Sequence, residues 1–173
     1  MMSPNNDELT QDLPVDFQVV VLMQRQPSQV SRWSDYQWQA AGVMAIASNT
    51  VEGESPRIVC DEGGVMQVLY SGFRVQLYVD ACESYYFNLI SPNPQCYVIA
   101  RVDDDNVPVP FLVSMSFDEA QAYLEADEEV FVVDVPPELY RWTEAFVLQN
   151  YRPQKRKKRK RDDWKSREEG SHR

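Results

Sequence analysis

The chain has 173 residues, of which 43% are hydrophobic and 12% aromatic, and its formal net charge is −10. This length suits one folded domain, and the aromatic content is typical of a folded chain, because disordered chains are poor in Trp, Tyr and Phe. No apolar run approaches the roughly 18 residues of a membrane span, and the acidic, polar N-terminus lacks the features of a secretory signal, so we expect a cytoplasmic protein.

The N-terminal third predicts a mobile arm followed by two strands. Residues 1–15 are polar and acidic and are expected to form the arm. The Val-rich run Phe17–Gln24 predicts a strand that ends by Pro27, because proline cannot donate a hydrogen bond to a sheet. Ala40–Ala47 predicts a second strand. Residues 48–64 contain Asn, Gly, Pro and acids, and we expect them to form a loop.

The middle of the chain predicts an antiparallel meander. Apolar and polar residues alternate through Phe73–Val79, which is typical of a half-buried strand. Only Ser71-Gly72 separates this run from the apolar segment Val65–Tyr70, a spacing suited to a tight hairpin. Ser84–Ile90 and Gln95–Val102 flank a turn with two prolines, and their aromatic residues favour two further strands.

Two helices are expected near the C-terminus. Ser116–Leu124 begins with the Ser-x-x-Glu spacing of a capping box, which is followed by an apolar stripe. Val130–Val135 predicts a short strand. Pro136-Pro137 then opens a second helix with one apolar face, and Pro153 ends it.

Strands first and helices last predict an α+β fold, with a mostly antiparallel sheet of about five to seven strands covered by one or two C-terminal helices. The expected organisation is a flexible arm at residues 1–15, a single domain at residues 16–152 and a disordered basic tail at residues 153–173.

Few residues offer catalytic chemistry. The sole histidine, His172, stands next to the C-terminus, which excludes a histidine-based triad or zinc site in the folded part. No lysine precedes Lys155, and no phosphate-binding glycine motif occurs. The acidic runs Asp103–Asp105 and Asp127–Glu129 are interpreted as solvated turns, since neither has the spacing of a calcium loop. We therefore predict no catalytic residues, no metal, no cofactor and a protein that is not an enzyme.

The cysteines and arginines of residues 1–151 are expected to serve the structure. Cys60, Cys82 and Cys96 are odd in number and widely spaced, which in a cytoplasmic protein indicates reduced packing residues rather than disulfides. Six arginines stand among 23 acidic residues in this part of the chain, and arginine suits ion pairs with carboxylates.

The aromatic block Ser31–Trp38 has two interpretations. An exposed Trp33 and Tyr36 would form a protein interface, because Trp and Tyr are enriched in such surfaces. Alternating aromatic residues at the entrance to a strand instead favour core positions.

The charge changes sign near the C-terminus. From Arg152 onward the chain has eleven Lys and Arg against four Asp and Glu, a net charge of +7, whereas residues 1–151 have 6 against 23, a net charge of −17. Seven consecutive cations repel one another and predict a segment that is unfolded in isolation. These candidate interaction residues are Lys155, Arg156, Lys157, Lys158, Arg159, Lys160 and Arg161.

Such a tail can bind a polyanion or an acidic protein. On nucleic acid it would give a log–log salt dependence with a slope of about −4 to −6. However, the acidic body repels polyanions, and Trp164 is the sole aromatic residue in the tail for stacking on bases. We therefore rank a protein partner above nucleic acid, and simple solvation of the tail is a third possibility.

Several segments resemble a bacterial family of unknown function, number 3305. They are the Val-rich opening strand ending in Arg25, Arg32–Trp38 (RWSDYQW), Tyr97–Arg101 (YVIAR), Ser116–Leu124 with its EAQAYL, and the basic ending, so the similarity spans about residues 17–161. Members of that family tend to be encoded beside molybdenum-dependent formate dehydrogenases and their maturation factors, so the resemblance implies an accessory role. Some relatives are called molybdenum-cofactor guanylyltransferases, but the Gly-rich loop of that chemistry is absent from this sequence.

Three functions emerge as hypotheses. The first, which rests on the resemblance, is a non-enzymatic accessory or interaction protein linked to the assembly or maturation of a molybdenum-dependent formate dehydrogenase, with a subunit of that enzyme or a maturation factor as partner. The second is a nucleic-acid-associated regulator that binds through the tail. The third is a module that binds a small molecule or the molybdenum cofactor.

Overall fold

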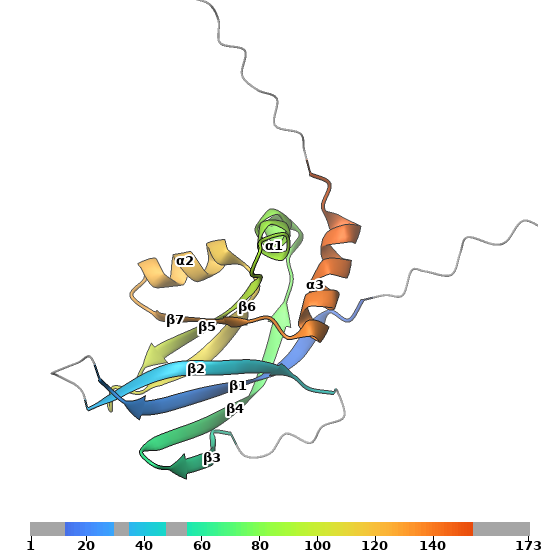
Figure 1. Cartoon of the computed structure of the whole chain (residues 1–173). Helices are drawn as coiled ribbons and strands as arrows, with labels where there is room; N and C mark the ends of the chain where they lie inside the picture. The colour runs from blue at the N-terminus through green and yellow to red at the C-terminus, as the bar shows by residue number, and fades with distance from the viewer. Residues whose placement is uncertain (1–12, 30–34, 48–54, 154–173) are drawn as a thin grey trace, which may run out of the picture.

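The computed structural model describes residues 13–29, 35–47 and 55–153, and these contain seven strands and three α-helices (Figure 1). In chain order they are β1 (Asp16–Pro27), β2 (Tyr36–Ala45), β3 (Arg57–Glu62), β4 (Val65–Gln76), α1 (Cys82–Leu89), β5 (Gln95–Val102), β6 (Pro108–Ser114), α2 (Phe117–Glu125), β7 (Glu129–Asp134) and α3 (Pro137–Asn150). All strand pairs are antiparallel, in two sheets of order β2-β1-β4-β3 and β6-β5-β7. The predicted α+β class is confirmed, with the strands divided between two sheets. Residues 1–12 of the predicted arm and the tail from residue 154 onward lie outside the described residues.

β1 is an inner strand of the first sheet and confirms the strand predicted from its valines. It pairs with β2 on one side and with β4 on the other. Its alternate residues Val19, Val21 and Met23 have no exposed surface, because one row of side chains on a strand faces the core. Pro27 is the last residue of β1 and lies opposite Tyr36. The second strand, β2, therefore begins four residues earlier than predicted.

The predicted hairpin at Ser71-Gly72 is wrong, because β4 runs through these residues without turning back. Two steps along β1, from Val19 to Val21, lie opposite three steps along β4, from Phe73 to Tyr70. The extra residue is a β-bulge, and Gly72 has a φ of +89°, which an L side chain rarely adopts. A Ser-Gly pair thus marks a bulge here.

The predicted loop at residues 48–64 is also partly wrong, because Arg57–Glu62 forms the edge strand β3. A two-residue turn at Gly63-Gly64, with φ of +61° and +82°, joins β3 to β4. Positive φ at both central positions is the geometry of a type I′ turn, one of the two turn types favoured in two-residue hairpins. The tight turn of this region therefore lies at the Gly-Gly pair.

The strand predicted at Ser84–Ile90 is wrong as well, since Cys82–Leu89 forms α1. A short 3-10 turn, η1 (Val79–Ala81), leads into it. Tyr and Phe favour strands when judged alone, but tertiary packing overrides such weak preferences. In α1, Cys82, Tyr85 and Leu89 are buried on one face against the core.

The second sheet confirms the later predictions. β5, β7, α2 and α3 lie where the sequence placed them, and Asp103–Asn106 forms the turn between β5 and β6. The Asp103 carboxylate accepts hydrogen bonds from the backbone N–H groups of Asp105 and Val107 at 3.0 and 2.8 Å. The expectation of a turn at this acidic run is met.

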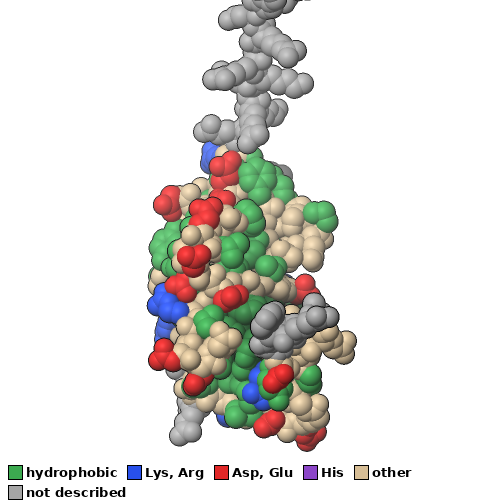
Figure 2. Space-filling view, turned by 90° about the vertical axis from the view of Figure 1, so that its left-hand side faces the viewer, with side chains coloured by type: hydrophobic (Ala, Val, Ile, Leu, Met, Phe, Trp, Pro, Cys, Tyr) green, Lys and Arg blue, Asp and Glu red, His purple; other side chains and the backbone are tan. Residues whose placement is uncertain are grey.

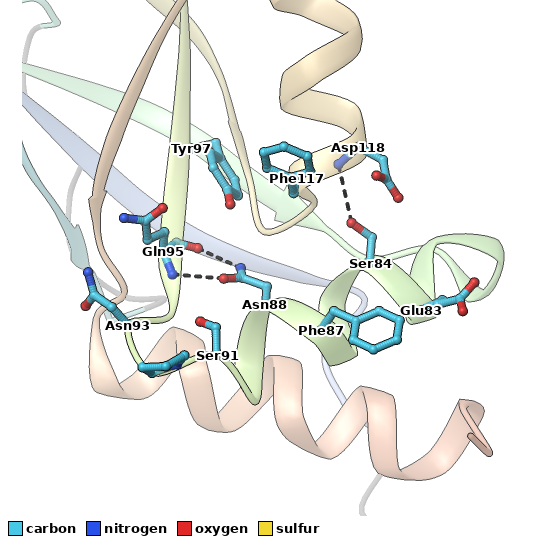
Figure 3. Close-up of a pocket in the computed structure, with 11 residues that line it drawn as sticks. Glu83, Ser84, Phe87, Asn88, Ser91, Asn93, Gln95, Tyr97, Phe117 and Asp118 are labelled. Atoms are coloured by element: carbon cyan, nitrogen blue, oxygen red, sulfur yellow. Dashed lines mark hydrogen bonds between the residues drawn. The ribbon is translucent and has the colours of Figure 1, made fainter. Parts of the chain in front are cut away.

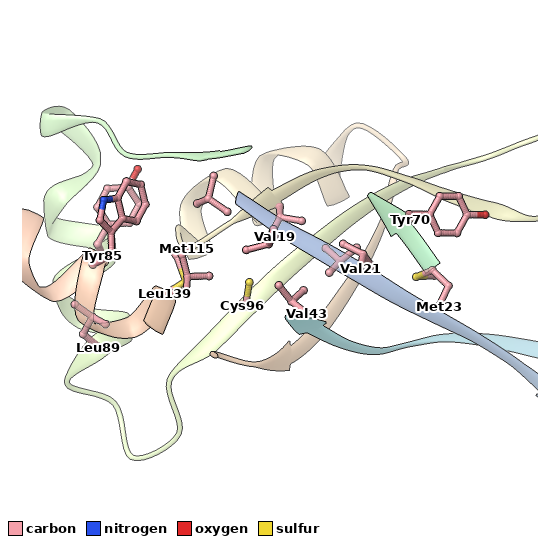
Figure 4. Close-up of a cluster of buried hydrophobic side chains, with 14 of the residues drawn as sticks. Val19, Val21, Met23, Val43, Tyr70, Tyr85, Leu89, Cys96, Met115 and Leu139 are labelled. Atoms are coloured by element: carbon pink, nitrogen blue, oxygen red, sulfur yellow. The ribbon is translucent and has the colours of Figure 1, made fainter. Parts of the chain in front are cut away.

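The two sheets and the helices form layers around β5. In Figure 1 the second sheet lies over the first, α2 covers its outer side, and α1 and α3 stand together at one end. Cys96 and Val98 of β5 belong to the main core with β1, β2, β4, α1 and α3 (Figure 4). Tyr97 and Ile99 instead pack with Ala120 of α2. Both faces of β5 are therefore buried, which explains its continuous apolar sequence.

α3 ties the N-terminal segment to the fold. Its face of Leu139, Trp142 and Val147 is buried, and the Trp142 indole N–H donates to the Pro14 carbonyl at 3.1 Å. None of the helices in the described residues is long and apolar enough to cross a membrane.

Candidate functional site

The α1–α2 groove is a cavity of about 660 Å³ between α1, residues 91–93, the start of β5 and the start of α2 (Figure 3). It forms because α1 and the N-terminal end of α2 lie side by side over the edge of the second sheet. Its defining side chains are Glu83, Phe87, Asn88, Gln95, Phe117 and Asp118.

Asn88 fixes the base of the groove. Its side-chain Nδ2 donates to the carbonyl oxygens of Gln95 and Met115 at 2.7 and 2.9 Å, and its Oδ1 accepts from the Gln95 N–H at 2.9 Å. The side chain is 8% exposed, so water does not readily replace these bonds. Asn88 therefore holds α1, β5 and the segment before α2 together.

Serine hydroxyls occupy the N-terminal end of α2. The Ser116 Oγ accepts from the Glu119 N–H at 3.1 Å, as the predicted cap, and donates to the Ser84 Oγ at 3.0 Å. The Ser84 Oγ also accepts from the Asp118 N–H at 3.4 Å. Glu119 does not bond back to Ser116 directly: its carboxylate accepts from the Ser114 hydroxyl, which accepts from the Ser116 N–H. These N–H groups of the first turn thus already have acceptors within the fold.

Two exposed aromatic rings border the groove. Phe117, the first residue of α2, is 54% exposed and meets Tyr97 edge to face at 6.2 Å between ring centroids. Phe87 of α1 is 52% exposed and meets Tyr86 edge to face at 5.5 Å. Large apolar side chains left in water from two separate elements form a surface that a partner can cover.

The charged side chains that line the groove are both carboxylates. Glu83 lies in the first turn of α1 and Asp118 in the first turn of α2, and both are exposed. The ion pairs of the described residues join Arg74 to Asp16 and Arg101 to Glu128, so neither engages a groove carboxylate. Figure 2 shows red acidic side chains among green apolar ones over the upper part of one face, with few blue basic ones. The groove suits a ligand that combines cationic and apolar groups.

Comparison with protein families matches residues 18–161 to a family described as proteins of unknown function, DUF3305. The chain belongs to this family. Neither the curated proteins nor the solved structures gave a match. The resemblance drawn from the sequence motifs is thereby confirmed for the family, whose description assigns no reaction, and the groove is the feature of this family member that we take as its candidate site.

In this family member, aromatic contacts connect Phe87 of the groove, through Tyr86, to the end of α3. Tyr86 packs on Tyr151 with ring centroids 5.1 Å apart, and the Tyr140 hydroxyl donates to the Leu89 carbonyl at 3.4 Å. These contacts pack α3 against α1 and bring Tyr151, at the end of α3, beside α1. Desolvation, followed by the negative charge of Glu83, raises the pKa of Tyr151.

The structure places one of the residues predicted to interact. Tyr36 starts the outer strand β2 and is 45% exposed, so the core position favoured for it is wrong. The Arg25 guanidinium carbon lies 4.3 Å from the centre of the Tyr36 ring. Trp33 and the cations Lys155–Arg161 lie outside the described residues. Tyr36 does not line the α1–α2 groove.

Sequence reasoning missed the residues that define the groove. Phe87 was missed because Ser84–Ile90 was predicted as a strand, and Glu83, just before that segment, was not singled out. Phe117 and Asp118 were recognised only as parts of a capping box. The signal that was available is that Phe117 is a large apolar residue in the first turn of a helix, ahead of its apolar stripe.

Buried titratable groups of the core have a structural role. Burial raises the pKa of the Cys96 thiol to about 12 and that of the Tyr85 phenol to about 12. A thiol with such a pKa holds its proton at neutral pH and is a poor nucleophile. Cys82 and Cys96 are buried and Cys60 is half-buried, all as free thiols, in agreement with the predicted packing role. Within residues 13–29, 35–47 and 55–153, no cluster of three or more His, Cys, Asp and Glu side chains is placed to hold a metal.

Proposed function

We propose that this protein is a non-enzymatic accessory protein that binds a segment of a protein partner in the α1–α2 groove. The observation that carries the proposal is the placement of two exposed phenyl rings, Phe87 and Phe117, beside two carboxylates, Glu83 and Asp118. Aromatic side chains dominate the energy of many protein interfaces. A partner segment with Arg or Lys next to apolar residues complements this surface in both charge and polarity.

The hydroxyl and amide side chains in the groove and beside it are engaged within the fold, which supports a binding role. The hydroxyls of Ser84 and Ser116 bond each other and the backbone of α2, so their hydrogen-bonding capacity stabilises the helix. The Asn88 amide makes three hydrogen bonds to backbone groups. The exposed lining of the groove includes the two phenyl rings, the two carboxylates and the neutral side chain of Asn93.

The proposed partner is a subunit of a molybdenum-dependent formate dehydrogenase or one of its maturation factors. This assignment comes from the family resemblance and the genomic neighbourhood that it implies. If the partner binds in the groove, we expect its contacting segment to be basic and partly apolar.

Affinity purification of the tagged full-length chain from its own host, with nuclease treatment, tests the proposal. The groove variant Phe87→Ala/Phe117→Ala is compared with Ile58→Ala/Leu124→Ala, which removes side chains of similar exposure, 60% and 52%, outside the groove. We expect a formate dehydrogenase or maturation protein with the wild type and the control. The groove variant should bind it roughly thirtyfold more weakly, because two interface residues that each contribute about 1 kcal/mol together contribute about 2 kcal/mol. Equal recovery with both variants would contradict the groove, and recovery of neither class of protein would contradict the partner.

A second candidate function rests on the seven cations at Lys155–Arg161, which suit a nucleic-acid-associated regulator. It predicts nucleic acid in the purification when nuclease is omitted. It further predicts that replacing these seven residues by Gln abolishes binding and its steep dependence on salt. Nucleic-acid binding that survives the replacement would exclude the tail as the binding element.

A further inference from the structure

We propose that the basic segment Lys155–Arg161 of the same chain binds in the α1–α2 groove and occupies it until a partner displaces it. The displacement rests on the proposed function, whereas the occupation of the groove by the tail does not depend on any partner. Three features of the chain support this occupation: where the tail starts, which groups the groove presents, and how the charge is distributed.

The tail starts beside the groove. Tyr151 ends α3 with its N–H donating to the Val147 carbonyl at 2.8 Å, and its ring packs on Tyr86 of α1. Glu83 lies three residues, just under one helical turn, before Tyr86 on the same helix and lines the groove. The chain therefore leaves α3 within one helical turn of a groove carboxylate.

The tail is long enough to reach the whole groove. Lys155 follows Tyr151 by four residues, a span of up to about 14 Å when extended, and Arg161 follows by ten, up to about 35 Å. The eight-residue helix α1 is about 12 Å long, so the segment can pass along α1 to the start of α2 without strain. Because the segment is tethered to α3, its effective concentration at the groove is on the order of millimolar, so weak binding suffices.

The groove complements the segment in charge and in exposed apolar surface. Glu83 and Asp118 carry no ion pair with the described residues, and residues 1–151 have a net charge of −17. Phe87 and Phe117 expose ring surface that guanidinium groups can stack on and that the aliphatic stems of Lys and Arg can cover. The groove therefore offers both charge pairing and apolar cover to the same kind of side chain.

The distribution of lysine allows a direct test on the full-length chain. Every lysine of the protein lies at or after Lys155, so a zero-length carbodiimide cross-link from a lysine to a carboxylate of the body reports where the tail lies. We expect cross-links to concentrate on Glu83 and Asp118, at a yield that does not change with protein concentration. They should decline strongly at about 1 M salt, where the screening length falls to about 3 Å.

Two variants of the full-length chain complete the test. Glu83→Gln/Asp118→Asn should shift the remaining cross-links away from the groove, whereas Asp61→Asn/Glu62→Gln on the edge strand β3 should leave the pattern unchanged. The inference would be overturned by any of three results. The cross-links could spread evenly over the body, their pattern could be insensitive to salt, or no cross-links to the body could form. Cross-links that join two chains and grow with concentration would also overturn it, since the occupant would then be a second copy.

The test separates the inference from the proposed function. If the Phe87→Ala/Phe117→Ala variant loses the partner while the tail cross-links at random, the groove binds a partner without self-occupation. If the tail cross-links to Glu83 and Asp118 while the partner binds both variants equally, the tail occupies the groove and the partner binds elsewhere.

Discussion

The side chain of Asn88 pairs with both backbone polar groups of Gln95, accepting from its N–H at 2.9 Å and donating to its carbonyl at 2.7 Å. The same Nδ2 donates to Met115 at 2.9 Å, so one amide joins the end of α1, the start of β5 and the approach to α2. Because α1 and α2 supply both sides of the groove, the shape of the groove depends on this buried side chain.

The substitution Asn88→Ala should therefore lower the free energy of unfolding by about 2–4 kcal/mol, since it leaves a buried N–H and two carbonyl groups without their partner. Urea unfolding followed by far-UV circular dichroism measures this change. The matched control is Asn150→Ala, which removes an exposed amide that donates to the Phe146 carbonyl within α3. We expect the control to change stability by less than about 0.5 kcal/mol. A loss for Asn88→Ala no larger than the control would show that water replaces these bonds.

Gly72 and Gly42 form a second matched pair, because both lie in strands of the first sheet and neither would bring a new Cβ within 4 Å of another atom. Gly72 has a φ of +89°, and Gly42 does not adopt a positive φ. Gly72→Ala should thus lower stability by about 1–2 kcal/mol through backbone strain alone. Gly42→Ala should be neutral or stabilising by up to about 1 kcal/mol. Thermal unfolding of both variants checks the difference, and equal melting temperatures would argue against the bulge.

The sequence predicted those elements that are specified by residues within the element itself or next to it. The valines of β1, the continuous apolar run of β5, the Ser116 cap of α2 and the proline start of α3 gave their elements within a few residues. In each of these segments the local preference and the tertiary packing favour the same element, so the local pattern was sufficient to predict it.

The elements that were missed depend on contacts far along the chain. α1 consists largely of residues with low helix propensity, and it is held by the burial of Tyr85 and Leu89 and by the bonds of Asn88. β3 is an edge strand whose Ile58 is 60% exposed, so it shows little of the alternation that identifies a strand. The groove could not be predicted once α1 was missed, since half of its defining side chains belong to that helix.

The stability of the fold should also decrease at alkaline pH, through Cys96. Burial raises the pKa of its thiol from 9.0 to about 12, so the folded state keeps a proton that the unfolded state loses. The unfolded state binds fewer protons between these values, and the free energy of unfolding therefore falls as the pH rises from about 9 toward 12, by up to about 1.4 kcal/mol per pH unit. Burial of Tyr85, whose pKa is raised from 10.0 to about 12, adds a fall of the same sign above pH 10.

Urea unfolding under reducing conditions at pH 7.5, 9 and 10.5 measures this dependence. Cys96→Ala should be less stable than the wild type at neutral pH, because it leaves a small cavity, but it should lose less stability between pH 9 and 10.5. Val98→Ala is the control, since Val98 is equally buried on the same face of β5 and carries no titrating group, and it should keep the slope of the wild type. The same alkaline slope in all three proteins would show that the Cys96 thiol does not govern this loss of stability.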